Sequence, residues 1–400
     1  MGFAMQRSTD ARPEWNAGCR RRDARRGLTL VETVAVVSLL GVLTAALTPI
    51  LSQGIATNGR TVSLKNLVLL GEAQACYAAD WSERQFSTSP KLLGTVNGNC
   101  NTYVSTVGCP NPVLLGWDPS GSAWGYYVGS SGLCAGTGFP GFCGNLAAYK
   151  PMSFSGSDAF FGAFRLPNVR GMQEYVAGAF YRPTYFSTLD FQAWESAKPF
   201  FSVEPQFPGS VAVADFRYSS YVFSPAAMFH PGVLRRPSAG GFQNPNAGFS
   251  NAYDVPAQSM CSYPDLKSRM IEHNWLVDPP ALANPAFAGS EPYYFNHGID
   301  SKPGVLYFDG SVDEMTMQQA VDDDAAALLA SGGIDGLWSR DTPIGADGYF
   351  GAQAYDDTRN SFHILTTDGI LGRDFLHRSP QQDAAQSART PHAARRGGAR

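Results

Sequence analysis

The sequence contains none of the short motifs that mark the common catalytic sites. There is no GxSxG nucleophile elbow, no HExxH zinc motif, no GxxxxGK[ST] phosphate loop and no GxGxxG directly after a predicted strand. Histidine is scarce, with six in 400 residues, and no two lie within four positions of each other. Catalytic triads assemble from scattered residues, so these absences do not exclude catalysis. The sequence therefore indicates no particular catalytic residue, and we expect a non-enzymatic protein without a cofactor.

The body of the chain has fewer basic than acidic residues. The net charge is -4 overall, but residues 1–27 carry seven arginines against three acids, and residues 379–400 carry four arginines against one. Residues 28–378 therefore hold a net charge of about -11. Nucleic-acid binding needs a basic face, so no nucleic-acid partner is expected.

Charge is almost absent from one long stretch near the N-terminus. Residues 28–51 contain a single formally charged side chain, Glu32, and follow Arg25, Arg26 and Gly27. As a helix at about 1.5 Å per residue, this stretch would extend about 36 Å, enough to cross a hydrocarbon core of about 30 Å. We therefore expect a membrane-spanning helix. An unpaired carboxylate in it would cost about 2 kcal/mol or more, so Glu32 requires a partner.

The sequence RRGLTLVETVAVVSLLGVLTAALTPILSQ, residues 25–53, resembles the prepilin-type cleavage and methylation segment of type IV pilins and type II secretion pseudopilins. Gly27 matches the residue before the cut, Leu28 the first mature residue, in place of the usual Phe, and Glu32 the fifth. The resemblance implies cleavage after Gly27 by a prepilin peptidase and methylation of the Leu28 amine. It also implies that Glu32 pairs with the N-terminal amine of a neighbouring subunit. Pro49 falls where many pilins carry a helix-kinking proline.

Two other targeting signals compete with this interpretation. A plain signal anchor would tolerate Glu32 near the membrane interface. A secretory signal peptide fits less well, because its apolar region has about 7–15 residues and ends at a small-residue cut site. The joint register of Gly27, Glu32 and Pro49 favours the prepilin segment. With the basic leader inside, the positive-inside rule predicts a single-pass inner-membrane protein with a cytoplasmic N-terminus and an extracytoplasmic or periplasmic head, carried into a filament after processing.

Cysteine usage agrees with export. Cys19 lies in the leader, and an even number of cysteines follows, which suggests disulfides: Cys76, Cys100, Cys109, Cys134, Cys143 and Cys261. Six cysteines allow 15 pairings. The equal spacings favour two local loops, Cys100–Cys109 and Cys134–Cys143, which leaves Cys76 to pair with Cys261. No CxxC spacing is present, so no zinc site is expected.

The apolar residues of 52–81 keep a helical spacing and predict that the membrane helix continues outward as an amphipathic rod. Within it, residues 63–83, SLKNLVLLGEAQACYAADWSE, resemble the region that follows the anchor in large pilin-like proteins that are numerous in planctomycetes.

Between residues 86 and 295 the chain is dense in glycine, proline, serine, asparagine and aromatics, which indicates short strands and long loops. The expected strands are Trp124–Val128, Ala159–Phe164, Glu174–Phe180, Ser210–Ala214 and Tyr218–Ser224. The aromatics of this region could form a sugar-binding platform, but we favour core positions for them. They include Trp117, Trp124, Tyr126, Tyr127, Phe160, Phe161, Tyr181 and Phe223.

A hairpin is predicted within EPYYFNHGIDSKPGVLYFDGSVDEM, residues 291–315. Val305–Phe308 and Ser311–Met315 flank Asp309-Gly310, a dipeptide typical of the type I′ turn. The stretch resembles an element with a histidine followed by Asp-Gly near the C-terminus of the same pilin-like family, with His297 in the histidine position at a longer spacing. A metal site of His297 with Asp300, Asp309 and Asp313 is the alternative, but turn and strand roles explain the aspartates without it.

Further along, Gln318 to Leu329 predicts an acidic helix that ends at Gly332-Gly333. Residues 379–400 have no periodicity and are expected to be disordered.

We expect an α+β fold in which a long pilin-like N-terminal helix, membrane-spanning in its first half and amphipathic in its second, packs on a loop-rich antiparallel β head. The expected domains are a leader at 1–27, the helix at 28–85 with its membrane segment at 28–51, the head at 86–378 and the tail at 379–400. The expected function is a pilin or pseudopilin subunit. Its partners would be the prepilin peptidase, further copies of the chain, other pilins and the inner membrane. The rival is an extracytoplasmic binding or hydrolytic domain, for example for polysaccharide, on a pilin-type anchor.

Overall fold

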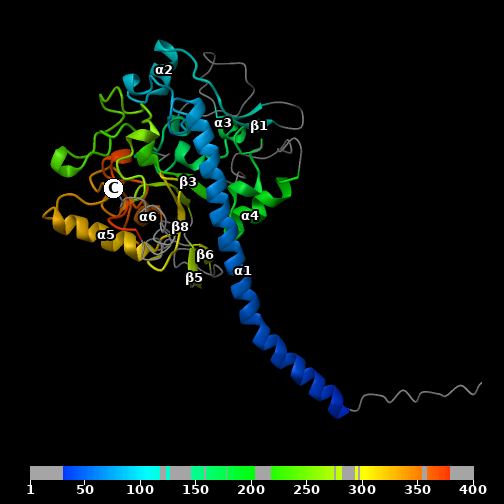
Figure 1. The fold of residues 1–400 in the computed structure, drawn as a ribbon. Helices are drawn as coiled ribbons and strands as arrows, with labels where there is room; N and C mark the ends of the chain where they lie inside the picture. Colours follow the sequence, from blue (N-terminus) through cyan, green and yellow to red (C-terminus); the bar gives the residue numbers. More distant parts are fainter. Residues whose placement is uncertain are drawn as a thin grey trace, which may run out of the picture. The chain divides into compact units, whose positions relative to one another are not determined.

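The computed structural model describes residues 30–117, 123–126, 146–156, 159–176, 178–202, 218–273, 276–281, 293–295, 298–353 and 358–378. The chain divides into two compact units, Met1–Ile55 and Ala56–Arg400. Helix α1, Leu30–Asp80, contributes residues to both units, and all other described elements belong to the second (Figure 1).

In the first unit the described residues form the beginning of α1. The side chains of Val34, Val36 and Val37 are each more than half exposed, at 58%, 51% and 62%. The hydroxyl of Ser38 donates to the carbonyl of Val34 at 2.8 Å, so this polar group is satisfied within the helix.

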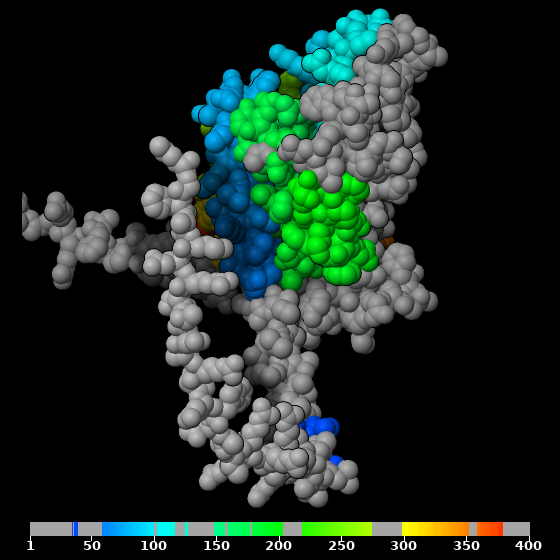
Figure 2. Space-filling model, turned by 90° about the vertical axis from the view of Figure 1, so that its right-hand side faces the viewer, coloured from blue at the N-terminus to red at the C-terminus, as the bar shows by residue number. Residues whose placement is uncertain are grey.

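In the second unit α1 buries one face. Its buried residues recur every three or four positions, which places them on a single stripe of a helix with 3.6 residues per turn. They are Gly59, Ser63, Asn66, Leu67, Leu70, Ala73, Gln74, Tyr77 and Ala78. Figure 2 shows this part of α1, in blue, lying alongside residues 178–202, in green. The Asn66 amide donates to the carbonyls of Pro183 and Phe186 at 3.3 and 3.2 Å, which fixes that contact.

The largest sheet has four antiparallel strands in the order β3-β4-β7-β8. The strands are β3 (Tyr221–Phe223), β4 (Ser268–Glu272), β7 (Gly304–Tyr307) and β8 (Val312–Glu314). Two antiparallel pairs accompany it: β1 (Val113–Trp117) with β2 (Ala123–Tyr126), and β5 (Leu276–Ala281) with β6 (Tyr293–Phe295).

Small residues let α1 lie close to β7. A Cβ atom added at Gly71 would stand 3.0 Å from Leu306, and one added at Gly304 would stand 3.1 Å from Leu67. Both distances are tighter than ordinary side-chain contact, so glycine is what the packing of this helix on this strand requires.

The other described helices are short. The α-helices are α2 (Cys100–Thr106), α3 (Arg170–Gln173), α4 (Phe191–Ala197), α5 (Met317–Ala330) and α6 (Gly348–Gln353). Single 3₁₀ turns occur at Gly94–Val96, Leu146–Tyr149, Ala163–Arg165, Pro183–Tyr185, Lys198–Phe200, Pro225–Ala227, Pro237–Ala239, Gln258–Met260 and Gly369–Leu371.

Aromatic side chains dominate the core of the second unit. Ten of the largest fully buried side chains are Tyr181, Tyr185, Tyr221, Tyr253, Tyr307, Tyr349, Phe164, Phe180, Phe186 and Phe229. The core interpretation of the predicted aromatics is confirmed for Tyr181 and Phe223, which are buried, and for Tyr126, Phe160 and Phe161, which pack against the core. The side chains of Trp117, Trp124 and Tyr127 lie outside the described part.

The fold class expected from the sequence is wrong. It required an N-terminal helix whose first half spans a membrane, packed on a β head. The structure is a mixed fold of helices and small sheets in which every described helix other than α1 has at most 14 residues. Within the described residues, no helix combines the length and the apolar character needed to cross a membrane. In the part of α1 whose side chains are described, Arg60, Lys65, Glu72 and Asp80 are charged, so this part is too polar to cross a membrane.

The same finding contradicts the predicted location as a single-pass inner-membrane protein. The prediction depended on the length of the run 28–51 and on its single formal charge, Glu32.

The strand predictions for the middle of the chain are partly wrong. Strand β3 falls within Tyr218–Ser224, and β2 overlaps Trp124–Val128. Residues 159–164 instead form a turn and the start of a 3₁₀ turn, and residues 174–180, where described, form turns and bends after α3. Both segments are apolar, and their residues Phe164 and Phe180 are buried in the core. An apolar segment can be buried as a strand or as a packed loop, and the sequence pattern does not distinguish the two. Residues 210–214 lie outside the described part.

The predicted hairpin is confirmed, but its turn type is not. Strands β7 and β8 pair antiparallel, and the Gly310 N–H donates to the Tyr307 carbonyl at 3.1 Å. Gly310 has a φ of +83°, whereas Asp309 is not among the residues with positive φ, so the turn is not type I′. The Tyr307 N–H also donates to the Ser311 carbonyl. This is a three-residue loop with a left-handed glycine.

Candidate functional site

Of the residues predicted for processing, assembly and kinking, two lie outside the described part and two lie in α1. Gly27 and Leu28 are outside the described residues. Glu32 is the third residue of α1, although its side chain is not described, and the helix assignment continues without a break through Pro49. Their roles in cleavage, methylation, assembly and kinking therefore stay predictions.

The predicted Cys76–Cys261 disulfide is wrong, because both cysteines are free. Cys76 is on the exposed side of α1, while Cys261 is half-buried beside a 3₁₀ turn, where burial raises the pKa of its thiol to about 11. Cys109 is disulfide-bonded. The side chain of Cys100 and all of Cys134 and Cys143 lie outside the described part, so the two local pairings stay predictions.

The described part of the chain gives the predicted aspartates other roles. His297 lies outside the described residues. Asp309 caps its own turn by accepting from the Ser311 N–H at 2.9 Å and also bonds Arg378. Within the described residues, no group of three or more histidine, cysteine or acidic side chains could hold a metal ion.

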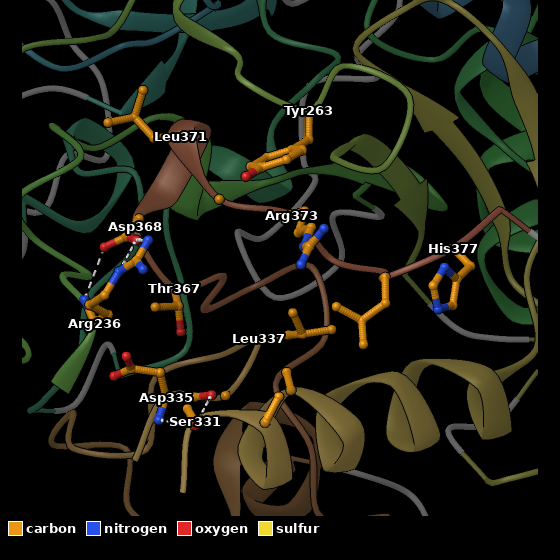
Figure 3. A pocket seen from close by; sticks show the side chains of 15 residues that line it. Arg236, Tyr263, Ser331, Asp335, Leu337, Thr367, Asp368, Leu371, Arg373 and His377 are labelled. Carbon is orange, nitrogen blue, oxygen red and sulfur yellow. Dashed lines mark hydrogen bonds and ion pairs between the residues drawn. The ribbon is translucent and has the colours of Figure 1, made fainter. Parts of the chain in front are cut away.

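The second unit contains an open pocket of about 520 Å³ (Figure 3). It lies between the end of α5, the 3₁₀ turn at Gly369–Leu371 and the segment that follows it. Its walls are Arg236, Tyr263, Ala327, Ala330, Ser331, Asp335, Gly336, Leu337, Thr367, Asp368, Leu371, Gly372, Arg373, Leu376 and His377. The volume is within the range of about 300–1,000 Å³ that is typical of small-molecule sites.

The C-terminus of α5 shapes one wall. The helix ends at Ala330 and is followed by Gly332 and Gly333, both with positive φ, and the Gly333 N–H donates back to the Leu328 carbonyl at 2.7 Å. The Ser331 hydroxyl then accepts from the Asp335 N–H at 2.8 Å and contacts the Asp335 carbonyl at 3.0 Å. This turn holds Asp335 at the edge of the pocket.

An ion pair forms a second wall. The Arg236 Nε donates to Asp368 Oδ2 at 2.7 Å, and the Arg236 backbone N–H donates to Oδ1 at 3.0 Å. The hydrogen bond to Asp368 and its charge raise the pKa of Arg236. Asp368 and Gly369 both have left-handed backbones, with φ of 61° and 60°, a conformation that these two residue types tolerate.

Asp335 is held by Ser238. Its Oδ1 accepts from the Ser238 N–H at 2.9 Å and its Oδ2 from the Ser238 hydroxyl at 2.5 Å, and these bonds lower the pKa of the Asp335 carboxyl. A general acid for hydrolysis needs a raised pKa, so Asp335 is unsuited to that role.

Two polar groups of the pocket have no partner in the described residues. The Arg373 guanidinium stacks over the Tyr263 ring, with its Cζ 5.0 Å from the ring centroid, and makes no hydrogen bond or ion pair there. The Thr367 side chain is 8% exposed, and its hydroxyl oxygen is buried without a hydrogen-bond partner.

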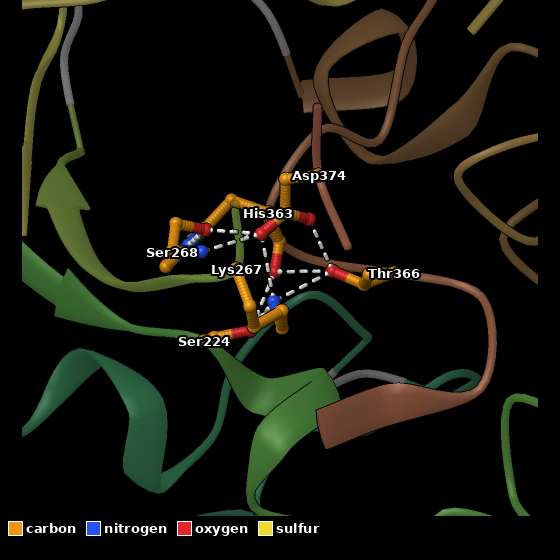
Figure 4. A network of polar contacts seen from close by, with 6 residues as sticks. All are labelled: Ser224, Lys267, Ser268, His363, Thr366 and Asp374. Atoms are coloured by element: carbon orange, nitrogen blue, oxygen red, sulfur yellow. Dashed lines mark hydrogen bonds and ion pairs between the residues drawn. The ribbon is translucent and has the colours of Figure 1, made fainter. Parts of the chain in front are cut away.

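A buried polar network lies deeper in the unit (Figure 4). Lys267 Nζ donates to Ser224, Thr366 and Asp374 at 2.9, 2.8 and 2.8 Å. Ser268 bonds both Asp374 and the Nδ1 of His363, the latter at 2.6 Å. Burial would raise the pKa of Asp374, but Lys267 and His363 hold it below its usual value.

This network contains serine, histidine and aspartate but is not arranged as a catalytic triad. In a triad the aspartate orients the histidine, whereas here Asp374 accepts from Ser268 and Lys267. All six side chains are essentially inaccessible to solvent, and burial together with Lys267 lowers the pKa of His363 to about 3. The network therefore joins β4 to the C-terminal segment, as a buried ion pair with satisfied hydrogen bonds can.

Sequence reasoning missed both the pocket and the network. Their residues are separated by tens to more than a hundred positions, and none belongs to a short motif. The one local signal at the pocket is the Asp-Gly dipeptide at Asp368-Gly369, which indicates a turn but not a binding site.

Comparison with protein-family models, with curated proteins and with solved structures finds no match to this chain. The function must therefore be argued from the residues themselves.

Proposed function

We propose that this chain is a pilin- or pseudopilin-like structural subunit. A prepilin peptidase cuts it after Gly27, and the mature chain assembles with further copies and with other pilins into a filament. The N-terminal sequence motif motivates this proposal, and the position of α1 supports it.

The supporting observation is that Glu32 lies within α1, so its carboxylate is carried by a regular helix. In an assembly, the new amine of a neighbouring Leu28 supplies the full positive charge that Glu32 needs.

Exposed apolar side chains on α1 are available for contacts between subunits. In the first unit these are Val34, Val36 and Val37, and in the second they include Val68 and Leu69, at 42% and 39% exposure. Fully burying such a side chain contributes about 1.5–3 kcal/mol, so several contacts along one helix suffice for assembly.

The experiment compares Glu32→Ala with Glu72→Ala. Both remove a carboxylate from α1, but Glu72 is exposed in the second unit and has no assembly role in this proposal. We expect both variants to be cut after Gly27. We expect only Glu32→Ala to be lost from sedimented filaments in the native host. Incorporation of Glu32→Ala at the wild-type level would refute the pairing role.

The pocket favours a second candidate, a binding domain that shares only the pilin-type N-terminus. A hydrolytic version is less suited, because Asp335 and Asp368 are both engaged, by Ser238 and by Arg236.

A further inference from the structure

Of the two arginines that line the pocket, only Arg373 has no carboxylate bonded to it among the described residues. Asp368 is paired with Arg236, and both carboxylate oxygens of Asp335 accept from Ser238. Among the described residues, Arg373 has only the ring of Tyr263 beside it. A guanidinium presents parallel N–H donors that match a carboxylate, so this position is built for an anionic group.

Acceptors for hydroxyl groups also line the pocket. The Thr367 hydroxyl is not one of them, because its oxygen has almost no accessible surface. Figure 3 shows Thr367 among the pocket side chains together with the Arg236–Asp368 pair and Asp335. The two aspartates can accept further bonds from hydroxyl groups of a ligand.

The remaining wall is apolar. Leu337, Leu376, Ala327 and Ala330 line it, and the Tyr263 ring adds an aromatic surface that is 41% exposed. A ligand that matches Arg373, the two aspartates and this apolar wall carries a carboxylate, several hydroxyl groups and a face of C–H bonds.

We propose that this pocket binds the uronic acid unit of an acidic saccharide. The carboxylate pairs with Arg373, the hydroxyl groups bond the two aspartates, and the ring face packs on the leucines and alanines. A neutral sugar leaves Arg373 unpaired. An apolar acid offers no donors to Asp335 and Asp368, and a phosphate, with a charge of about -1.5 to -2, is repelled by them more strongly than a carboxylate. The proposal does not depend on filament assembly.

The test is isothermal titration of the full chain with D-galacturonate, with tetragalacturonate and with D-galactose. Arg373→Gln removes the proposed carboxylate partner. Arg235→Gln is the matched control, because Arg235 is exposed, lies close in sequence to a wall residue and is not part of the wall. Both variants change the net charge equally.

We expect galacturonate to bind and galactose to bind at least tenfold more weakly. Arg373→Gln should weaken galacturonate by at least tenfold, the usual effect of losing a charge-assisted bond, while Arg235→Gln retains wild-type affinity. Tighter binding of the tetramer would identify a polymer as the source, and equal affinity a free sugar acid.

Equal affinity for galacturonate and galactose, or an Arg373→Gln variant that binds normally, would overturn the proposal. If Arg373→Gln does not fold, hydrogen exchange on the wild-type chain decides the question. Galacturonate should then protect peptides 331–337 and 367–377, and protection elsewhere or nowhere rejects the site.

Discussion

At the scale of single residues, the buried carboxyl group of Glu272 shows how burial and hydrogen bonding oppose each other. Burial raises the pKa of Glu272 to about 7, although Ser63 and the Gly304 N–H, at 2.8 Å, donate to it. Ser63 lies on α1 and Gly304 on β7, so this carboxyl joins the helix to the sheet. Tyr221 also contacts the Ser63 hydroxyl at 2.8 Å.

This raised pKa predicts a pH-dependent stability. Between the unfolded value of about 4.3 and the folded value of about 7, folding takes up a proton at Glu272. Its contribution to the free energy of unfolding is therefore fully present below about pH 4.3 and is lost as the pH rises through 7. Relative to Glu272→Gln, the wild type should lose about 3 kcal/mol between pH 4 and pH 8, measured by urea unfolding.

The control for this prediction is Glu72→Gln, which removes an exposed carboxylate from α1. It should keep the pH profile of the wild type. Parallel profiles for Glu272→Gln and the wild type would show that folding does not raise the pKa of Glu272.

Neither Glu272 nor the Lys267 network could be predicted from the sequence. Ser63 and Glu272 are 209 positions apart, and Lys267 and Asp374 are 107 apart. A single sequence shows only that these residues are charged, and charged residues are usually exposed. Their burial follows from tertiary packing that no local pattern records.

At the scale of elements, the buried stripe of α1 in the second unit follows the spacing seen in the sequence. Leu67 is fully buried against the sheet, whereas Leu69, two positions later, is 39% exposed. Residues two apart on a helix point in different directions, so the same side chain meets core at one position and solvent at the other.

This difference predicts unequal effects of the same substitution. Leu67→Ala should lower the free energy of unfolding by about 2–5 kcal/mol, through lost burial and a residual cavity. Leu69→Ala should change it by no more than about 0.5 kcal/mol. Thermal or urea unfolding measures both, and similar losses for the two variants would mean that the buried face is assigned wrongly.

The β7–β8 hairpin gives a backbone test. Gly310 has a φ of +83°, and a Cβ atom added there would have no neighbour within 4 Å. Gly310→Ala should therefore cost about 1–2 kcal/mol from the left-handed backbone alone. Gly310→Asn should cost less, because asparagine tolerates this conformation. Equal costs measured by urea unfolding would contradict the left-handed turn.

The elements with a local signal were predictable, and the others were not. The hairpin has Asp-Gly between two apolar runs, and α5 has the Thr316 cap and the Gly332-Gly333 stop. The segments 159–164 and 174–180 are apolar because they are buried, and that pattern does not specify a strand. Likewise, the disulfide of Cys76 was inferred by elimination, which carries no distance information.

At the scale of the whole molecule, the chain combines an N-terminal sequence that resembles a prepilin segment with a large unit built from loops, 3₁₀ turns and small sheets. The resemblance implies a cut and an assembly role, while the second unit contributes a pocket and a buried aromatic core. The expected membrane span is contradicted, so processing at Gly27 is the claim on which the proposed function depends.

The most direct measurement is the intact mass of protein isolated from the native cells, with peptide mapping of its N-terminus. We predict a chain that begins at Leu28, with or without one added methyl group, and a loss of cleavage in a Gly27→Leu variant. A chain that retains residues 1–27 in the wild type would contradict the account, and the pocket around Arg373 would then be the place to seek its function.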